Sequence, residues 1–171
     1  MKKKFKKRYI LLFLAVCFLI YNIVWFVNWY SYRKMEKALG YNERYQSYVY
    51  KEDDFIYSVF PPHYLSLTGN YDISQSVKLY ENPTTIGMLI WPKFFGGYEV
   101  GIIIEHHYLD EATSNENEYN YKSEEIYILL DEHMKPKNKE SEQALAENAD
   151  MLDEIEAMYE RAYKRWGILK Q

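Results

Sequence analysis

The sequence predicts an α+β protein, in which an antiparallel sheet of about five or six strands and a long C-terminal helix follow an N-terminal transmembrane helix. Three observations lead to this fold class. Residues 9–30 contain no charged side chain, several short segments between residues 55 and 130 are β-branched or alternate apolar with polar residues, and apolar residues recur every three or four positions after residue 141.

The N-terminal segment combines a basic cluster with an apolar run. Six of residues 2–8 are basic, and the next 22 residues, Tyr9–Tyr30, are uncharged. A helix of that length spans about 33 Å, enough to cross a hydrocarbon core. We therefore expect residues 9–30 to form a transmembrane signal anchor. Because basic residues stay on the cytoplasmic side, residues 1–8 should be cytoplasmic and residues 31–171 should form one extracellular domain.

Two other interpretations of this segment are less consistent with the residues. A cleaved signal has a shorter apolar region and a small-residue cleavage site, but the nearest such site, residues 38–40, lies beyond three basic residues. A lipoprotein signal has a small residue before its cysteine, whereas Val16 precedes Cys17 and the apolar run continues past it. Both comparisons favour an uncleaved anchor.

Charge and cysteine content limit the partners of the domain. Apart from the N-terminal cluster, 15 basic residues stand against 25 acidic ones, so residues 9–171 carry a net charge of about −10. Nucleic acid binds basic surfaces, so it is excluded as a natural partner of this acidic domain. A protein with a basic surface would instead be attracted to the domain. The single cysteine, Cys17, lies in the anchor, so the predicted domain contains no disulfide.

The middle of the chain is predicted to form a series of strands. A short helix over Tyr32–Leu39 should end at Gly40. The expected strands are Phe55–Phe60, Tyr64–Thr68, Val77–Glu81, a central strand Ile86–Trp91, Tyr98–Glu105 and Ile126–Leu130. Residues 94–97 should form a hairpin turn, and the acidic residues 110–120 should form a solvated loop.

The last element changes to helical periodicity. Ser141 is a candidate N-cap, basic residues lie late in the segment and Gly167 follows it. One face should be formed by Leu145, Ala149, Leu152, Ile155, Tyr159, Ala162 and Trp166.

Catalytic and ligand-binding signatures are not found in the sequence. His106 and His107 are adjacent, but consecutive strand residues point to opposite faces and cannot both bind one ion without a bulge. No glycine-rich phosphate loop or nucleophile elbow occurs. We expect a protein that is not an enzyme and has no catalytic residue, metal site or cofactor. An envelope hydrolase would instead require interacting carboxylates in a deep pocket.

Aromatic residues, at 18% of the chain, are the most unusual feature of its composition. They either cover the second face of the sheet or bind a protein partner, for which tyrosine supplies rigid contact area. The predicted partner-binding residues are four aromatic side chains near the turn and four acidic side chains in the loop: Trp91, Phe94, Phe95, Tyr98, Asp110, Glu111, Glu116 and Glu118.

Four runs of the domain resemble one known family. They are YLSLTGNYDIS (64–74), GMLIWPKFFGGYEVGIII (87–104), EEIYILLDEHMKP (124–136) and MYERAYKRWGIL (158–169). Together with the basic signal anchor they look like the TipC family of membrane-anchored immunity proteins. This resemblance implies protection of a Gram-positive cell from a toxin of a type VII secretion pathway that attacks a lipid-linked cell-wall precursor outside the cytoplasm. A non-catalytic accessory component of a secretion or cell-envelope complex is the alternative.

Overall fold

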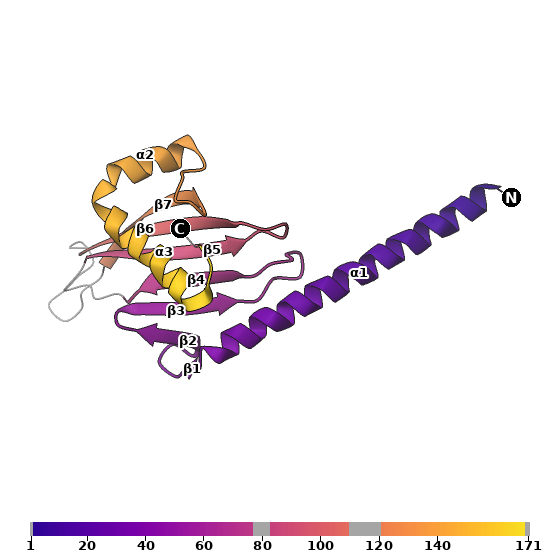
Figure 1. Cartoon of the computed structure of the whole chain (residues 1–171), viewed down its shortest axis with the longest axis horizontal. Helices are drawn as coiled ribbons and strands as arrows, with labels where there is room; N and C mark the ends of the chain where they lie inside the picture. Colours follow the sequence, from indigo (N-terminus) through magenta and orange to yellow (C-terminus); the bar gives the residue numbers. More distant parts are fainter. Residues whose placement is uncertain (1, 77–82, 110–120, 170–171) are drawn as a thin grey trace.

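The computed structural model describes residues 2–76, 83–109 and 121–169, and within them it has the α+β architecture that the sequence predicts (Figure 1). A long helix leads into a sheet, and two helices and a 3₁₀ turn follow the sheet. In chain order the elements are α1 (Lys2–Ala38), β1 (Tyr41–Asn42), β2 (Ser47–Glu52), β3 (Phe55–Phe60), β4 (Asn70–Gln75), β5 (Thr84–Pro92), β6 (Tyr98–Leu109), β7 (Tyr121–Asp131), α2 (Lys139–Glu147), the 3₁₀ turn (Ala149–Met151) and α3 (Leu152–Trp166).

The sheet is an antiparallel meander of seven strands in the order β1-β2-β3-β4-β5-β6-β7. The sequence predicts five or six strands, and its strand Phe55–Phe60 coincides with β3. Strands β1, β2 and β4 were not predicted, because β1 and β2 mix tyrosine with polar residues and β4 is mostly polar, as loops are. The predicted strand Val77–Glu81 lies outside the described residues.

The hydrophobic core lies between one face of this sheet and α3. Side chains from four neighbouring strands are almost completely excluded from solvent on this face: Ile73, Met88, Ile90, Val100, Ile102, Ile104, Ile128 and Leu130. The register aligns them in rows, with Met88 opposite Ile73 and Ile102, and Ile102 opposite Ile128. From α3, Ile155, Met158, Tyr159 and Ala162 complete the core.

The C-terminal helix is broken, whereas the sequence predicts a continuous one. The cap of α2 is Asn138, whose side chain accepts from the Ser141 N–H, and the buried Ser141 hydroxyl accepts instead from the Leu129 N–H at 2.8 Å. The chain leaves α2 at Asn148 and changes direction through the 3₁₀ turn, so Ala149 is exposed rather than on the buried face. Gly167 ends α3 in the left-handed conformation that its position predicts.

Residues 61–69 form a connection between β3 and β4, so the predicted strand Tyr64–Thr68 is wrong. The sequence predicts a strand here because leucine alternates with serine and threonine, which is the pattern of a half-buried strand. In the structure, however, the carbonyls of His63 and Leu67 accept hydrogen bonds from side chains of α1, at 3.0 and 2.8 Å, and not from a neighbouring strand.

Helix α1 continues without a break from the apolar run into the domain, so the predicted separate helix over Tyr32–Leu39 is the last part of α1. Tyr32 is buried against Gly69, and its ring centroid lies 5.7 Å from that of Tyr71, whose ring lies 4.9 Å from that of Trp166. A side chain on Gly69 would lie 2.7 Å from the Tyr32 ring and 2.1 Å from the Phe60 carbonyl. The glycine therefore allows α1 to dock.

Replacing Ile155 by alanine tests the packing of α3. This side chain is fully buried between α3 and the sheet, so we expect the substitution to lower the free energy of unfolding by about 2–5 kcal/mol. Urea unfolding of the detergent-solubilised protein, followed by tryptophan fluorescence, measures the change. The control is Glu156→Ala at the next, exposed position, which should change stability by less than about 0.5 kcal/mol. Equal effects at both positions would contradict the docking of α3.

Candidate partner-binding face of the sheet

The face of the sheet opposite α3 is not covered by any helix in the described part of the chain, and we call it the open face. Its residues alternate with those of the core and include Asp72, Leu89, Trp91, Ile103 and Tyr127. Although all five belong to inner or long strands, none is buried, and Tyr127 is 50% exposed. A sheet face with large apolar side chains open to solvent is typical of an interaction surface.

Gly101 shapes the centre of the open face. A β-carbon at this position would lie 2.5 Å from the Tyr127 hydroxyl and 2.8 Å from the Trp91 ring. The missing side chain therefore lets these two rings fold over the strand from either side. Tyr and Trp present rigid apolar area with a polar atom, the combination that is enriched in binding hot spots.

Asp72 is the most unusual polar residue of the open face. It lies in β4 between Ser58 of β3 and Leu89 of β5. Burial raises the pKa of its carboxyl group to about 6, and no side chain or N–H among the described residues forms a hydrogen bond or ion pair with it. A half-buried carboxylate without a partner costs free energy, so its position favours an incoming cation.

Other acidic residues of the same face lie toward its ends. Glu99 pairs with Lys137, and Glu105 lies 3.4 Å from His107. Between β1–β2 and the sheet, a hollow of about 380 Å³ is lined by Arg44, Tyr45, Ile56, Ser74, Gln75, Ser76, Thr85, Gly87 and Glu105. The β1–β2 turn thus borders the open face on one side and leaves the centre accessible.

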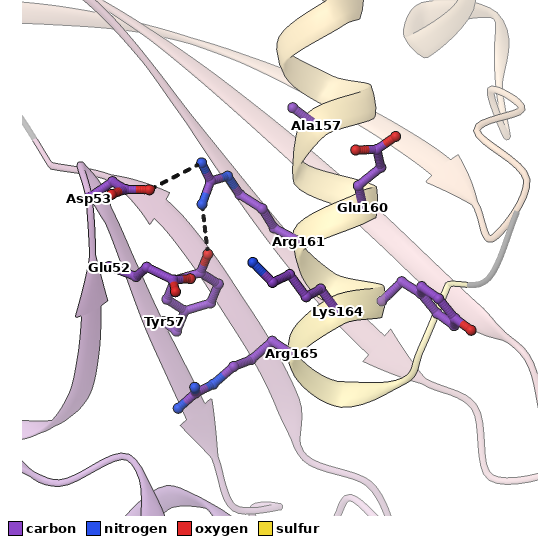
Figure 2. Close-up of a pocket in the computed structure, with 9 residues that line it drawn as sticks. Glu52, Asp53, Tyr57, Ala157, Glu160, Arg161, Lys164 and Arg165 are labelled. Carbon is purple, nitrogen blue, oxygen red and sulfur yellow. Dashed lines mark hydrogen bonds and ion pairs between the residues drawn. The ribbon is translucent and has the colours of Figure 1, made fainter.

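A larger hollow of about 710 Å³ lies on the other side of the sheet, between α3 and the β2–β3 turn (Figure 2). Arg161 donates to the Tyr57 hydroxyl at 3.2 Å, lies 3.8 Å from the Asp53 carboxylate and stacks on Phe55. The hollow contains three acidic and three basic side chains, Glu52, Asp53, Glu160, Arg161, Lys164 and Arg165. Its charges balance, and its principal cation is already engaged in joining α3 to β3.

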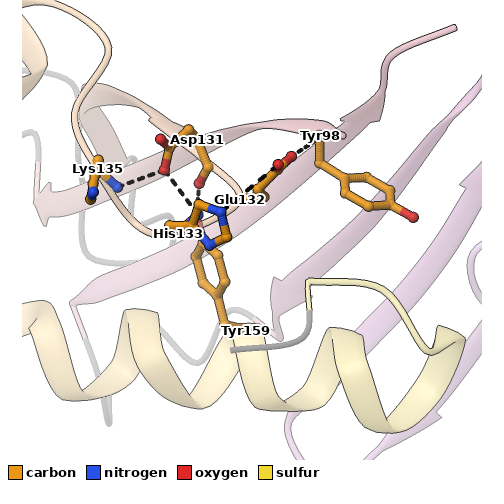
Figure 3. A network of polar contacts seen from close by, with 6 residues as sticks. All are labelled: Tyr98, Asp131, Glu132, His133, Lys135 and Tyr159. Carbon is orange, nitrogen blue, oxygen red and sulfur yellow. Dashed lines mark hydrogen bonds and ion pairs between the residues drawn. The ribbon is translucent and has the colours of Figure 1, made fainter. Parts of the chain in front are cut away.

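A polar network near the end of β7 stabilises a turn (Figure 3). Tyr159 of α3 donates to the Asp131 carbonyl at 2.9 Å, while the Asp131 carboxylate accepts from the N–H groups of His133 and Lys135. Glu132 accepts from the Tyr98 N–H at the start of β6. These contacts connect α3, β6 and the turn, so the carboxylates of Asp131 and Glu132 have a structural role.

The four predicted aromatic site residues lie in three different places. Trp91 lies on the open face, and Tyr98 on the opposite face, packed against the core. Phe94 and Phe95 occupy the tip of the β5–β6 turn, with ring centroids 5.2 Å apart. The predicted acidic residues Asp110, Glu111, Glu116 and Glu118 lie outside the described residues. Asp72 and Tyr127 were not singled out in the sequence, although strand alternation within β4 and β7 could have placed them on one face.

The adjacent histidines contact successive residues of β5. His106 lies 2.9 Å from the Thr84 hydroxyl, and His107 lies 3.2 Å from the Thr85 hydroxyl. Among the described residues, no group of three or more His, Cys, Asp or Glu side chains is arranged to hold a metal ion.

No family model, curated protein or solved structure matches this chain. The open face is the candidate site because it is partly open to solvent, carries Trp91 and Tyr127, and contains the carboxylate of Asp72, which has no partner among the described residues.

The raised pKa of Asp72 predicts a pH-dependent stability. Between its ordinary pKa of 3.8 and the folded value of about 6, the folded state holds a proton that the unfolded state has lost, so stability falls as pH rises through this window. Relative to Asp72→Asn, wild-type protein should lose about 2 kcal/mol of unfolding free energy between pH 4 and pH 7. Urea unfolding at a series of pH values measures this difference. A difference that stays constant with pH would contradict the burial of the carboxylate.

Proposed function

We propose that this protein is a membrane-anchored, outward-facing immunity protein that binds and neutralises an antibacterial toxin acting on the cell envelope. The observation that supports it best is the open face, where Asp72, which has no partner among the described residues, lies among the partly exposed Leu89, Trp91 and Ile103 and the exposed Tyr127. The resemblance to the TipC family points to the same function.

The open face has the chemical character of a protein-binding site. Leu89, Trp91, Ile103 and Tyr127 offer apolar area at its centre, and acidic residues lie toward its ends. A Lys or Arg of the toxin would pair with Asp72 in partly desolvated surroundings, where a charge-assisted hydrogen bond is stronger than at a wet surface. The excess of acidic residues would accelerate association with a basic toxin.

The anchor gives this binding function a location. One N-terminal helix is long and apolar enough to cross a membrane. On the proposal, the basic N-terminus stays in the cytoplasm and the domain lies outside, where a toxin that attacks a lipid-linked precursor acts. Tethering raises the effective concentration of the inhibitor at the membrane surface.

Replacing Asp72 by asparagine tests the binding face. The partner in the assay is the secreted product of the gene beside this one, and the full chain is held in lipid nanodiscs. Because the substitution leaves a toxin cation without its counter-charge, we expect affinity to fall at least about 30-fold, measured by biolayer interferometry. Cells that produce the variant should also lose protection.

A matched control removes an acidic charge elsewhere. Glu156→Gln lies on the exposed side of α3, away from the open face, and should leave affinity and protection unchanged. Equal binding by Asp72→Asn and wild type would exclude the open face. If the neighbouring product does not bind and the chain instead co-purifies with secretion-machine proteins, the alternative role as a non-catalytic accessory component is correct.

The orientation of the domain gives a separate prediction. Protease added to cells stripped of their wall should digest the domain, because the N-terminal basic residues keep their end inside. Immunoblotting with a C-terminal tag follows the loss, and a cytoplasmic protein in the same sample reports whether the membrane stayed intact. A C-terminal domain that is fully protected while cells are intact would reverse the orientation.

A further inference from the structure

Two connections of the sheet extend in the direction that α1 takes out of the domain (Figure 1). They are the β3–β4 loop, residues 61–69, and the β5–β6 turn, residues 93–97. Because the strands form an antiparallel meander, both connections lie at the same end of the strands. We call this end of the sheet, with its two connections, the anchor edge.

The β3–β4 loop is hydrogen-bonded to the apolar run of α1. Trp25 Nε1 donates to the His63 carbonyl at 3.0 Å, Asn28 Nδ2 donates to the Leu67 carbonyl at 2.8 Å, and the Tyr21 hydroxyl donates to the Tyr64 carbonyl. All three donors belong to residues 9–30. The loop therefore lies beside a part of the helix that is needed to cross the hydrocarbon core.

This arrangement satisfies a requirement of the membrane environment. Irregular backbone at membrane depth is tolerated only where protein groups satisfy its carbonyls, and the three donors from α1 do so. Away from the loop, the same stretch of α1 exposes Ile23 and Phe26, each 56% exposed. The helix thus offers one side to the loop and the other to lipid.

The anchor edge carries exposed apolar side chains and two lysines, beside the acidic Glu99 and Glu132. Leu65 is 91% exposed at the loop, and Phe95 is 98% exposed at the turn. Lys93 and Lys135 are exposed nearby, at the turn and just beyond the end of β7. Apolar tips flanked by lysine match a bilayer interface, where acyl chains lie beneath phosphate groups.

We propose that the anchor edge rests in the outer membrane–water interface, with Leu65 and Phe95 inserted among lipid headgroups and upper acyl chains. The domain then contacts the bilayer at three places, α1, the β3–β4 loop and the β5–β6 turn. This inference requires only that α1 spans a bilayer, and it does not depend on the proposed toxin.

Site-directed fluorescence on the full chain tests the proposal. Leu65→Cys and Phe95→Cys are made in a Cys17→Ser background, labelled with nitrobenzoxadiazole, and reconstituted in vesicles of phosphatidylcholine and phosphatidylglycerol. Both side chains are highly exposed, so neither substitution removes core packing. Lipids brominated on the upper acyl chain should quench both probes at least about threefold more than a probe at Ser123→Cys.

Two controls fix the scale of the measurement. Ser123 is exposed in the first part of β7, at the opposite end of the sheet, and reports a position in water. A probe on native Cys17 reports insertion of the helix. Quenching at residues 65 and 95 no greater than at Ser123, with Cys17 strongly quenched, would overturn the proposal. Disulfide cross-linking between Phe95→Cys copies without lipid quenching would also overturn it, because a second copy would then cover the edge.

Discussion

The contact of Tyr32 with Gly69 and Tyr71 is the constraint on which the rest of the molecule depends. It buries the last turns of α1 in the same core that receives Trp166 from α3. Because α1 is continuous, the apolar helix and the domain are joined without a flexible linker. The direction of the helix therefore determines which edge of the sheet lies nearest to a membrane.

The two faces of the sheet have different roles because α3 crosses only one of them. On that face, branched aliphatic residues of β4–β7 form a dry core. On the other, the same strands carry Asp72, Trp91 and Tyr127, which no described helix covers. Strand alternation alone produces this division, since successive residues point to opposite sides. The carboxylate of Asp72, which has no partner among the described residues, reduces stability above its raised pKa, and this cost is consistent with the proposed binding role.

The sequence predicts the parts of the fold that have strong periodicity. The buried face of β6 follows from the alternation of Val100, Ile102 and Ile104, and the end of α3 follows from Gly167. It does not predict β4, in which Asp72 interrupts the apolar pattern, or the loop at residues 61–69, whose carbonyls bond to α1 more than 35 residues away. Asp72 was not predicted as a site residue, because its burial and raised pKa depend on neighbouring residues from other strands.

The geometry is also compatible with the proposed position of an acidic domain beside an anionic membrane. The strands run toward the anchor edge, on the side to which α1 leaves the domain (Figure 1). Two exposed lysines, Lys93 and Lys135, lie at the anchor edge, whereas Glu105 lies toward the opposite end of the sheet. Attraction between lysine and phosphate decays within about 10 Å, and so does repulsion of the acidic face. On the proposal that the anchor edge rests on the bilayer, this contact would hold the domain upright and leave the open face available to a partner that moves along the membrane surface.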